Sequence, residues 1–283
     1  MDKFISYAQN CEDVILWRAL HGISNGRYMD IGANHPLHDS VTKAFYDRGW
    51  RGINVEPIKS LYDLLVAERP RDINLCCAIS SQPGRSKFHE IINASGLSTL
   101  ENEVAKSHVQ SGLEVHTYEI PIETISALCS AHAIDNIHFL KIDVEGAELS
   151  VLQGMNFDHF KPWIIVVEAT RPNTQIPSHQ KWEPIILSNG YSAVYFDGAN
   201  RYYLSEAHKE LIQAFDAPPN GFDNYIQYSK HRQLLDELTA AREESSAYKN
   251  RLFEIKTSLS WKLTKPLRAI KYIASIASEI FKR

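Results

Sequence analysis

The sequence predicts an α/β domain with a doubly wound, mainly parallel sheet, followed by a helical tail. Two observations lead to this prediction. Short apolar, β-branched runs alternate with helical stretches through most of the chain, as they do in doubly wound sheets. From residue 231 to 255 the chain is instead rich in Leu, Glu, Ala, Lys and Arg and lacks Gly and Pro. We therefore expect a domain over residues 1–230 and a tail over residues 231–283.

The first half of the domain is expected to alternate helices with strands. Apolar residues spaced by three and four indicate helices, and β-branched runs bounded by Gly or Pro indicate strands. In order, we expect a helix over 5–21, a strand over 28–31, a helix over 40–46, a strand over 50–55, a helix over 59–66 and a strand over 73–79.

The second half of the domain continues the alternation and closes with a hairpin. We expect a strand over 116–121, a helix over 124–131, a strand over 137–142, a helix over 147–154, a strand over 163–167 and a hairpin of 194–196 with 201–204. In doubly wound sheets, ligands bind at the carboxyl ends of the strands. The functional residues should therefore follow directly after residues 31, 55, 79, 142 and 167.

The first strand ends in Asp30-Ile31-Gly32-Ala33-Asn34. The glycine permits a tight turn and a close approach between ligand and backbone, and a following helix would direct free N–H groups at the same space. The dinucleotide fingerprint GxGxxG would need glycines where Asn34 and Leu37 stand. The turn alone predicts a ligand site without naming the ligand.

Carboxylates follow two further strands. Glu56 ends the second strand, where an acidic group can accept the hydroxyls of a ribose, although a solvated loop carboxylate is the simpler alternative. Asp143, Glu145 and Glu148 lie close together at the end of another strand. Because neighbouring carboxylates repel one another, such a cluster costs electrostatic free energy and indicates a functional site. Glu145 and Glu148 also suit a first helical turn, where acids favour the helix dipole, so Asp143 has the clearer site role.

These motifs together resemble the FkbM-type family of methyltransferases. The resemblance covers about Ser6 to Tyr203 and rests on six stretches in order: SYAQNCEDVIL, YMDIGAN, INVEP, CAIS, KIDVEGAE and VVE. It implies a Rossmann-like fold of the class I methyltransferase type, with S-adenosylmethionine as methyl donor. It also implies that the acceptor is usually an oxygen on a sugar or another natural product.

The resemblance also implies roles for individual residues. Asp30, Gly32 and Asn34 would line the methionine part of the cofactor, and Glu56 would bind its ribose. The turn at Cys77-Ala78-Ile79 would lie against the adenine. Asp143 and Glu145 would face the methionine end and the acceptor.

Pro36 departs from the family pattern, which commonly has a glycine two residues beyond the Asn of DIGAN. Proline has no N–H, so one backbone contact to the cofactor would be missing. His35 and His38 flank it, and each has two interpretations: a residue at the surface or behind the site, which is the more common case in such a loop, or a proton acceptor.

A hydroxyl acceptor must lose its proton during methyl transfer, so a general base or a metal is useful. The candidates are Asp143 and Glu168, which would end neighbouring strands and also suit an oxygen-ligand site for Mg²⁺. Glu168 is followed by Ala169, so the second acid of an expected pair is absent.

Three polar features near these strands have open interpretations. Arg171 would either clamp an acidic acceptor or form a surface salt bridge, and His159 lies near the same strand. The loop over residues 93–98 (NASGLS) has the composition of a flexible lid over the site.

The end of the tail is basic and amphipathic. Between Lys249 and Arg283 nine Lys or Arg stand against Glu254 and Glu279, a net of +7. Pro266 should begin a helix over residues 267–281, and the stretch SLSWKLTKPLR resembles the C-terminal tails of some bacterial glycan-assembly enzymes. The tail would attach to a membrane surface, dock on a glycan-assembly complex, or form a homo-oligomer by packing on a neighbour.

Composition also bears on the partner, the state of the cysteines and the location of the protein. A formal charge of −4 argues against a main role in binding nucleic acid, so the expected partner is a small-molecule or glycan acceptor. The four cysteines form no CxxC pair and are expected to be reduced thiols. Neither a signal peptide nor a membrane span is evident, so we expect a cytoplasmic protein, with attachment at the inner face of the membrane left open.

Two other function classes compete with the methyltransferase. One is an NAD-dependent oxidoreductase on the same type of sheet, which the missing GxGxxG disfavours. The other is a degenerate cofactor-binding domain that acts as a scaffold through its tail, which Pro36 favours.

Overall fold

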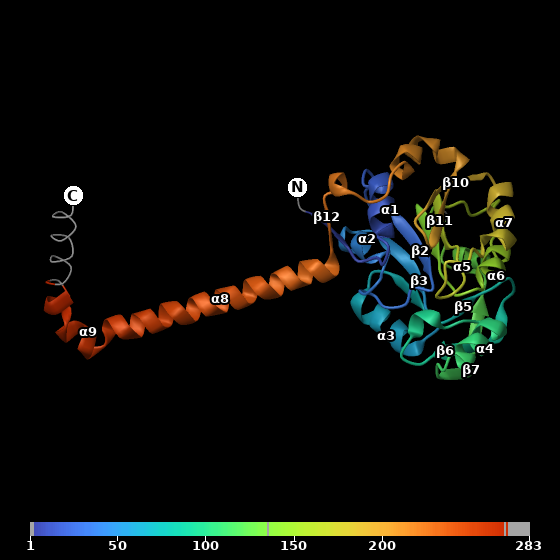
Figure 1. The fold of residues 1–283 in the computed structure, drawn as a ribbon. Helices are drawn as coiled ribbons and strands as arrows, with labels where there is room; N and C mark the ends of the chain where they lie inside the picture. Colours follow the sequence, from blue (N-terminus) through green and yellow to red (C-terminus); the bar gives the residue numbers. More distant parts are fainter. Residues whose placement is uncertain (1–2, 135, 269, 271–283) are drawn as a thin grey trace. The chain divides into compact units, whose positions relative to one another are not determined.

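The computed structural model describes residues 3–134, 136–268 and 270, and the chain divides into two units, residues 1–227 and 228–283 (Figure 1). The first unit holds the sheets and most of the helices. The described residues of the second unit are mainly helical.

The main sheet of the first unit has seven strands in the order β10-β11-β9-β8-β2-β3-β4 (Figure 1). Five neighbours are parallel: β2 (Arg27–Ile31), β3 (Arg51–Val55), β4 (Ile73–Leu75), β8 (Phe139–Ile142) and β9 (Ile164–Glu168). Two further strands, β11 (Asn200–Ser205) and β10 (Tyr191–Phe196), continue the sheet in antiparallel fashion. The predicted α/β class and the closing hairpin are confirmed, and the sheet is mixed rather than wholly parallel.

Helices cover both faces of this sheet, which explains the nearly continuous apolar runs of its central strands. Because side chains alternate along a strand, Met29 and Ile31 pack on one face and Tyr28 on the other. The first face carries α5 (Ile125–Ala131), α6 (Glu148–Gln153) and α7 (Glu183–Ser188), and the second carries α1 (Glu12–Leu20), α2 (Lys43–Asp47) and the 3₁₀ segment η3 (Glu206–Phe215).

A smaller sheet corrects the predicted strand over 73–79. The chain leaves the main sheet after β4, and Ala78 and Ile79 form β5 (Ala78–Ile79), which pairs in parallel with Ile122 and Glu123. The sheet order is β5-β7-β6, with β6 (Gly84–Ile91) and β7 (Val115–Glu123) antiparallel. The sequence gives no sign of β6, because its first four side chains are exposed. The α-helices α3 (Lys59–Glu68) and α4 (Asn102–Gln110) complete this region, and α4 was also not predicted.

The predicted helix over 5–21 is wrong in its first part. Residues 4–6 form β1 (Phe4–Ser6), which pairs in parallel with β12 (Tyr225–Gln227), and the helix α1 begins only at Glu12. The buried carboxylate of Asp13 accepts hydrogen bonds from Ser6 Oγ and from the N–H of Tyr7, both at 2.7 Å. These bonds hold the preceding chain in a turn, so the helix cannot extend toward the N-terminus.

Other boundaries agree with the sequence to within a few residues. The helix α2 starts three residues later than predicted, and short 3₁₀ turns occur at η1 (Ser95–Leu97), η2 (His179–Lys181) and η4 (Gly221–Asp223). All four cysteines are free thiols.

The second unit contains α8 (Tyr228–Thr257) and α9 (Leu259–Leu263), so the predicted long helix over 231–255 is confirmed. Within the described residues, no helix combines the length and the apolar character needed to cross a bilayer. The helix expected over 267–281 lies outside the described residues from 271 onward.

Candidate active site

A cavity of about 1020 Å³ opens at the carboxyl ends of the parallel strands of the main sheet. All eight residues that the sequence nominated for cofactor binding or catalysis line it: Asp30, Gly32, Asn34, Ala78, Glu56, Asp143, Glu145 and Glu168. They come from the ends of β2, β3, β8 and β9 and from β5. The carboxyl edge of the sheet therefore gathers residues that are far apart in sequence.

Gly32 sits where no other residue fits. Its φ is +83°, and an added Cβ would lie 1.9 Å from the carbonyl oxygen of Asp143. The N–H of Asp143 donates to the carbonyl of Ile31 at 3.0 Å. The turn after β2 and the turn after β8 are thus in direct contact, and only the missing Cβ of Gly32 permits this.

Glu56 is held by the backbone on both carboxylate oxygens. One oxygen accepts the N–H of Asn34 at 2.8 Å and the other accepts the N–H of Ile58 at 2.7 Å. Burial raises the pKa of Glu56 to about 7. Each carboxylate oxygen has two lone pairs, so the side chain keeps capacity to accept hydroxyl groups from a ligand.

Asp30 and the loop after Gly32 are supported by a buried arginine that sequence reasoning missed. Asp30 Oδ2 accepts from Thr42 Oγ1 at 3.0 Å. The Arg69 side chain is fully buried; its Nη1 contacts Thr42 Oγ1 at 3.3 Å, and its Nη2 donates to Ser40 Oγ at 2.9 Å and to the carbonyl of Pro36. Arg69 thus fixes the loop that contains Pro36. No local pattern in the sequence marks this residue.

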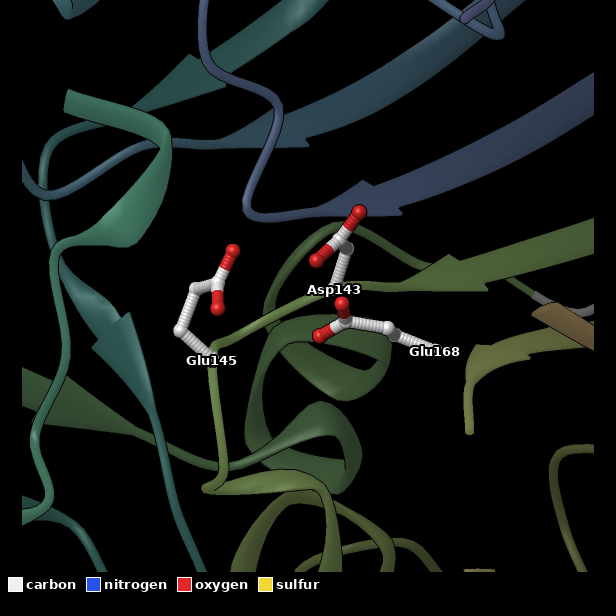
Figure 2. A group of neighbouring side chains, drawn as sticks. All are labelled: Asp143, Glu145 and Glu168. Carbon is white, nitrogen blue, oxygen red and sulfur yellow. The ribbon is translucent and has the colours of Figure 1, made fainter. Parts of the chain in front are cut away.

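Asp143, Glu145 and Glu168 form an acidic triad (Figure 2). One carboxylate oxygen from each lies within 4.8 Å of the other two. Glu168 ends β9 and Asp143 follows the neighbouring strand β8, whereas Glu145 reaches the group from a backbone with φ of +52°. The residue after Glu168 is Ala169 rather than a second acid, and the structure brings the carboxylate of Glu145 close to Glu168 instead.

The surroundings of the triad oppose full ionisation of its carboxyl groups. Burial raises the pKa of Glu145 and of Glu168, and the neighbouring carboxylate of Asp143 raises both further. Glu145 Oε2 and Glu168 Oε2 are buried without a hydrogen-bond partner. Such oxygens are unusual in a native interior and indicate a missing cationic or donor group.

Lys141 is the one ammonium group among the residues described as lining the cavity. Its Nζ donates to Asp143 Oδ2 at 2.6 Å. Burial opposes its charge, yet Asp143 and Glu12 raise the pKa of Lys141 above the usual lysine range. Lys141 therefore stays charged and orients Asp143, a role that sequence reasoning missed.

Other lining residues come from segments that the sequence did not connect. They are Gln9, Asn10 and Glu12 near the N-terminus, Thr170 and Asn173–Gln175 after β9, and Asp197–Ala199 in the hairpin turn. Glu12 accepts from Asn200 Nδ2 at 3.0 Å, and burial raises the pKa of Glu12 to about 7. Only the fold brings these segments together, so spacing in the sequence carries no signal for them.

His35 shapes the loop around Pro36. Its Nδ1 accepts the N–H groups of Leu37 and His38, both at 3.1 Å. That nitrogen must be unprotonated, and burial lowers the pKa of His35. The geometry gives this ring a role in holding the loop rather than in accepting a proton from a substrate. Arg171 and His159 are exposed and do not line the cavity.

The segment 93–100 bridges both ends of the cavity. Ser95 Oγ lies 3.3 Å from Asn34 Oδ1, and Thr99 Oγ1 donates to the carbonyl of Glu145 at 2.8 Å. All of its residues line the cavity. The expected lid thus lies at the cavity, and its movement stays a prediction.

Comparison with known proteins identifies the family. The family model described as the methyltransferase FkbM domain matches residues 30–193, which is 164 of the 283 residues. No curated protein matches the chain. A crystal structure of methyltransferase FkbM from Methylobacillus flagellatus KT aligns at 17% identity with a TM-score of 0.37, over 66% of this chain and 47% of that one. This chain thus spans about half of that protein, and the likeness is too distant to add to the family match. Because the family model covers more than half of the sequence, this chain belongs to the methyltransferase FkbM domain family.

Proposed function

We propose that this protein is an S-adenosylmethionine-dependent methyltransferase that methylates a hydroxyl oxygen of a sugar or glycan. Family membership supports methyl transfer. The observation that carries the rest is the meeting of Gly32, Glu56 and the acidic triad in one cavity. The proposal includes a Rossmann-like class I arrangement, which the five parallel strands with the site at their carboxyl ends support.

The residues around the cavity fit this cofactor in shape and in chemistry. Gly32 leaves space at the turn for the methionine part, beside Asp30 and Asn34. Glu56 keeps lone pairs for the ribose hydroxyls. Near Ala78 the lining is apolar, with Ile58, Ile79 and Phe88, as an adenine ring requires.

The acidic triad provides the charge that such a cofactor needs. When bound, S-adenosylmethionine supplies an electrophilic methyl group on a positively charged sulfur. The carboxylates of Asp143, Glu145 and Glu168 would face this charge, which would relieve their mutual repulsion. Positioning of the acceptor oxygen in line with the methyl group would supply much of the rate.

Glu168 is the proton acceptor that the geometry supports best. Its Oε2 is buried without a partner, whereas Asp143 is already engaged by Lys141. Once a cation stabilises the ionised triad, Glu168 could accept the proton of the acceptor hydroxyl. Lys141 would hold Asp143 in place beside it.

Magnesium is an alternative counter-charge for the triad. Three carboxylates within 4.8 Å of one another offer the oxygen ligands that Mg²⁺ prefers. Transfer measured after treatment with EDTA separates the two forms of the proposal. Activity that survives EDTA assigns the counter-charge to the cofactor, and activity restored only by Mg²⁺ assigns it to the metal.

The charge of the cavity also supports a neutral acceptor. Glu12, Glu168 and Asp197 line it, and Lys141 is already paired with Asp143. Among the described lining residues, a phosphate or uronate group would find no unpaired Lys or Arg and would meet carboxyl groups instead. We therefore expect an uncharged, hydroxyl-bearing sugar at the reacting end.

Calorimetric titration with S-adenosylmethionine and with NAD tests the cofactor. We expect binding of the first and none of the second. Binding of NAD alone would support an oxidoreductase, and binding of neither would support a scaffold; both outcomes contradict the proposal. Methyl transfer from labelled donor to isolated glycans, compared with sugar nucleotides, then tests the acceptor class.

The basic tail belongs to the same proposal, as an attachment to a membrane surface or to a glycan-assembly complex. It rests on the net charge of +7 between Lys249 and Arg283, given by nine basic and two acidic residues. Flotation of the full chain with anionic liposomes, compared with a chain ending at residue 248, tests the membrane form.

A further inference from the structure

The helix α8 presents large apolar side chains without covering them. It spans 30 residues, and none of its side chains is buried. Leu234, Leu238, Leu252 and Ile255 are 48%, 47%, 50% and 45% exposed. A helix with this much exposed apolar surface usually has a partner.

The apolar residues of α8 follow a heptad pattern. Starting at Leu234, steps of four and three residues alternate without interruption to the end of the helix. The positions reached are Leu234, Leu238, Ala241, Ser245, Tyr248, Leu252 and Ile255. All but Ser245 are apolar, and this period of 3.5 residues is that of a left-handed coiled coil. We call these seven positions the seam, with Leu234 at position d and Leu238 at position a.

The charged residues beside the seam show which partner fits. Position g carries Glu237, Glu244 and Arg251, and position e carries Leu235, Arg242, Lys249 and Lys256. In a parallel, in-register pair, each g residue faces the e residue of the next heptad on the other helix. This places Glu237 against Arg242 and Glu244 against Lys249 on both sides of the seam. Only the last pair, Arg251 against Lys256, joins like charges.

An antiparallel pair would make the opposite charge contacts. It sets g against g and e against e. With the seams centred on each other, Glu244 would face its own copy and Arg242 would face Lys249, and only Glu237 with Arg251 would join opposite charges. The charge pattern therefore favours a second copy of the same helix in parallel orientation over an antiparallel pair.

We propose that α8 forms a parallel, in-register coiled coil with the α8 of a second copy of this chain. Ala241 and Ser245 are small enough to let the helices approach closely at the centre of the seam. The seam ends where the helix ends, because the extended backbone of Ser258 separates α8 from α9. This association does not depend on the methyltransferase activity.

Light scattering and sedimentation equilibrium of the full chain test the association. The expected mass is at least twice the 32.2 kDa of one chain. Leu238→Asp places charge in the seam and should weaken association at least tenfold. Ala240→Asp adds the same charge outside the seam and should leave the mass unchanged. A monomer up to roughly 100 μM, or an unchanged mass for Leu238→Asp, would overturn the proposal.

Cross-linking tests the parallel register. Leu234→Cys lies near one end of the seam, so mild oxidation should join two copies only if the helices are parallel. Asp236→Cys, which points away from the seam, is the matched control, and the unmodified chain accounts for the four natural cysteines. An associated Leu234→Cys chain that does not cross-link beyond this control contradicts the parallel arrangement.

A charge exchange tests the pairing directly. Glu237→Lys should weaken association because it faces Arg242, and the added change Arg242→Glu should restore it. Failure of the second change to restore association would contradict the g-to-e contacts.

Discussion

The two ends of the cavity differ in how their carboxylates are satisfied. At the ends of β2 and β3, Glu56 accepts two backbone N–H groups and its surroundings are complete. At the ends of β8 and β9, Glu145 and Glu168 each keep a buried oxygen without a partner. The first end is thus held in place by the protein alone, whereas the carboxyl groups of the second end would be stabilised in their ionised form by a cationic ligand. Shape should therefore dominate the effects of mutations at the first end, and charge those at the second.

The largest effect is expected at the contact between the two ends. Gly32→Ala would place a Cβ 1.9 Å from the carbonyl oxygen of Asp143, so the backbone must shift. We expect a loss of about 3 kcal/mol or more in the free energy of unfolding, and loss of cofactor binding. Urea unfolding and calorimetric titration measure the two effects.

Gly112→Ala is the matched control for that clash. Gly112 has nearly the same φ, +85°, but nothing lies within 4 Å of an added Cβ. This variant should lower the free energy of unfolding by only about 1 kcal/mol, because a residue with a Cβ disfavours the left-handed backbone conformation. Equal losses for the two variants would show that backbone conformation, not the contact with Asp143, makes Gly32 necessary.

The next effect isolates charge at the second end. Glu168→Gln keeps the shape but removes one carboxylate and the proposed proton acceptor. We expect kcat to fall by about 100-fold, while the free energy of unfolding stays equal or rises because repulsion in the triad is relieved. Steady-state kinetics and thermal unfolding of the same preparation measure both.

The control for Glu168 is Glu119→Gln, a change at a side chain that is 66% exposed on β7. Neither kcat nor stability should change there. A Glu168→Gln variant that keeps full activity would remove Glu168 from the proposed chemistry, and a marked loss of stability would show that its carboxylate supports the fold.

A third prediction concerns Glu56, at the ends of β2 and β3. Glu56→Gln replaces one acceptor oxygen by an amide donor, which opposes the N–H of Asn34 or of Ile58. We expect cofactor affinity to fall about tenfold, with kcat at saturating cofactor nearly unchanged. A large fall in kcat with unchanged affinity would place Glu56 in the chemistry rather than in binding.

The sequence predicted one kind of feature well. Strand ends such as Asp30–Asn34 and Lys141–Glu145 combine a short apolar run with turn residues, so local pattern and local structure coincide there. The prediction failed where a distant partner decides the structure. Phe4–Ser6 is a strand only because Tyr225–Gln227 lies beside it, and residues 73–79 split because β7 captures Ala78 and Ile79.

In the site, too, the residues at strand ends could be predicted and those that depend on distant contacts could not. The eight nominated residues stand at strand ends, and all reach the cavity. Arg69, Glu12 and the turn at Asp197 contribute through contacts across the fold, which no spacing encodes. The unsatisfied oxygens of Glu145 and Glu168 are likewise a property of burial, so only the structure distinguishes the two ends of the cavity.

The smallest predicted effect is the pH dependence of cofactor selectivity. S-Adenosylhomocysteine differs from S-adenosylmethionine by the methyl group and its positive charge, so the ratio of their affinities reports the charge that the triad presents. Burial and mutual repulsion raise the pKa of Glu145 and of Glu168, so these groups hold protons at a pH where ordinary carboxyls are ionised. Raising the pH releases these protons and strengthens binding of the cation. We therefore expect the preference for S-adenosylmethionine to grow about threefold from pH 7.5 to pH 9.5, a range that spans the raised pKa of Glu145, about 9.

Two variants test whether this pH dependence arises from the triad at the ends of β8 and β9. Glu145→Gln should flatten the increase, because one of the titrating carboxyls is gone, whereas Glu56→Gln should weaken both ligands and leave their ratio unchanged. Calorimetric titration of both ligands at each pH measures the ratio. A ratio that does not vary with pH in the unmodified protein would mean that the triad is already ionised without a ligand. In that case Lys141, rather than the bound cation, would balance its charge.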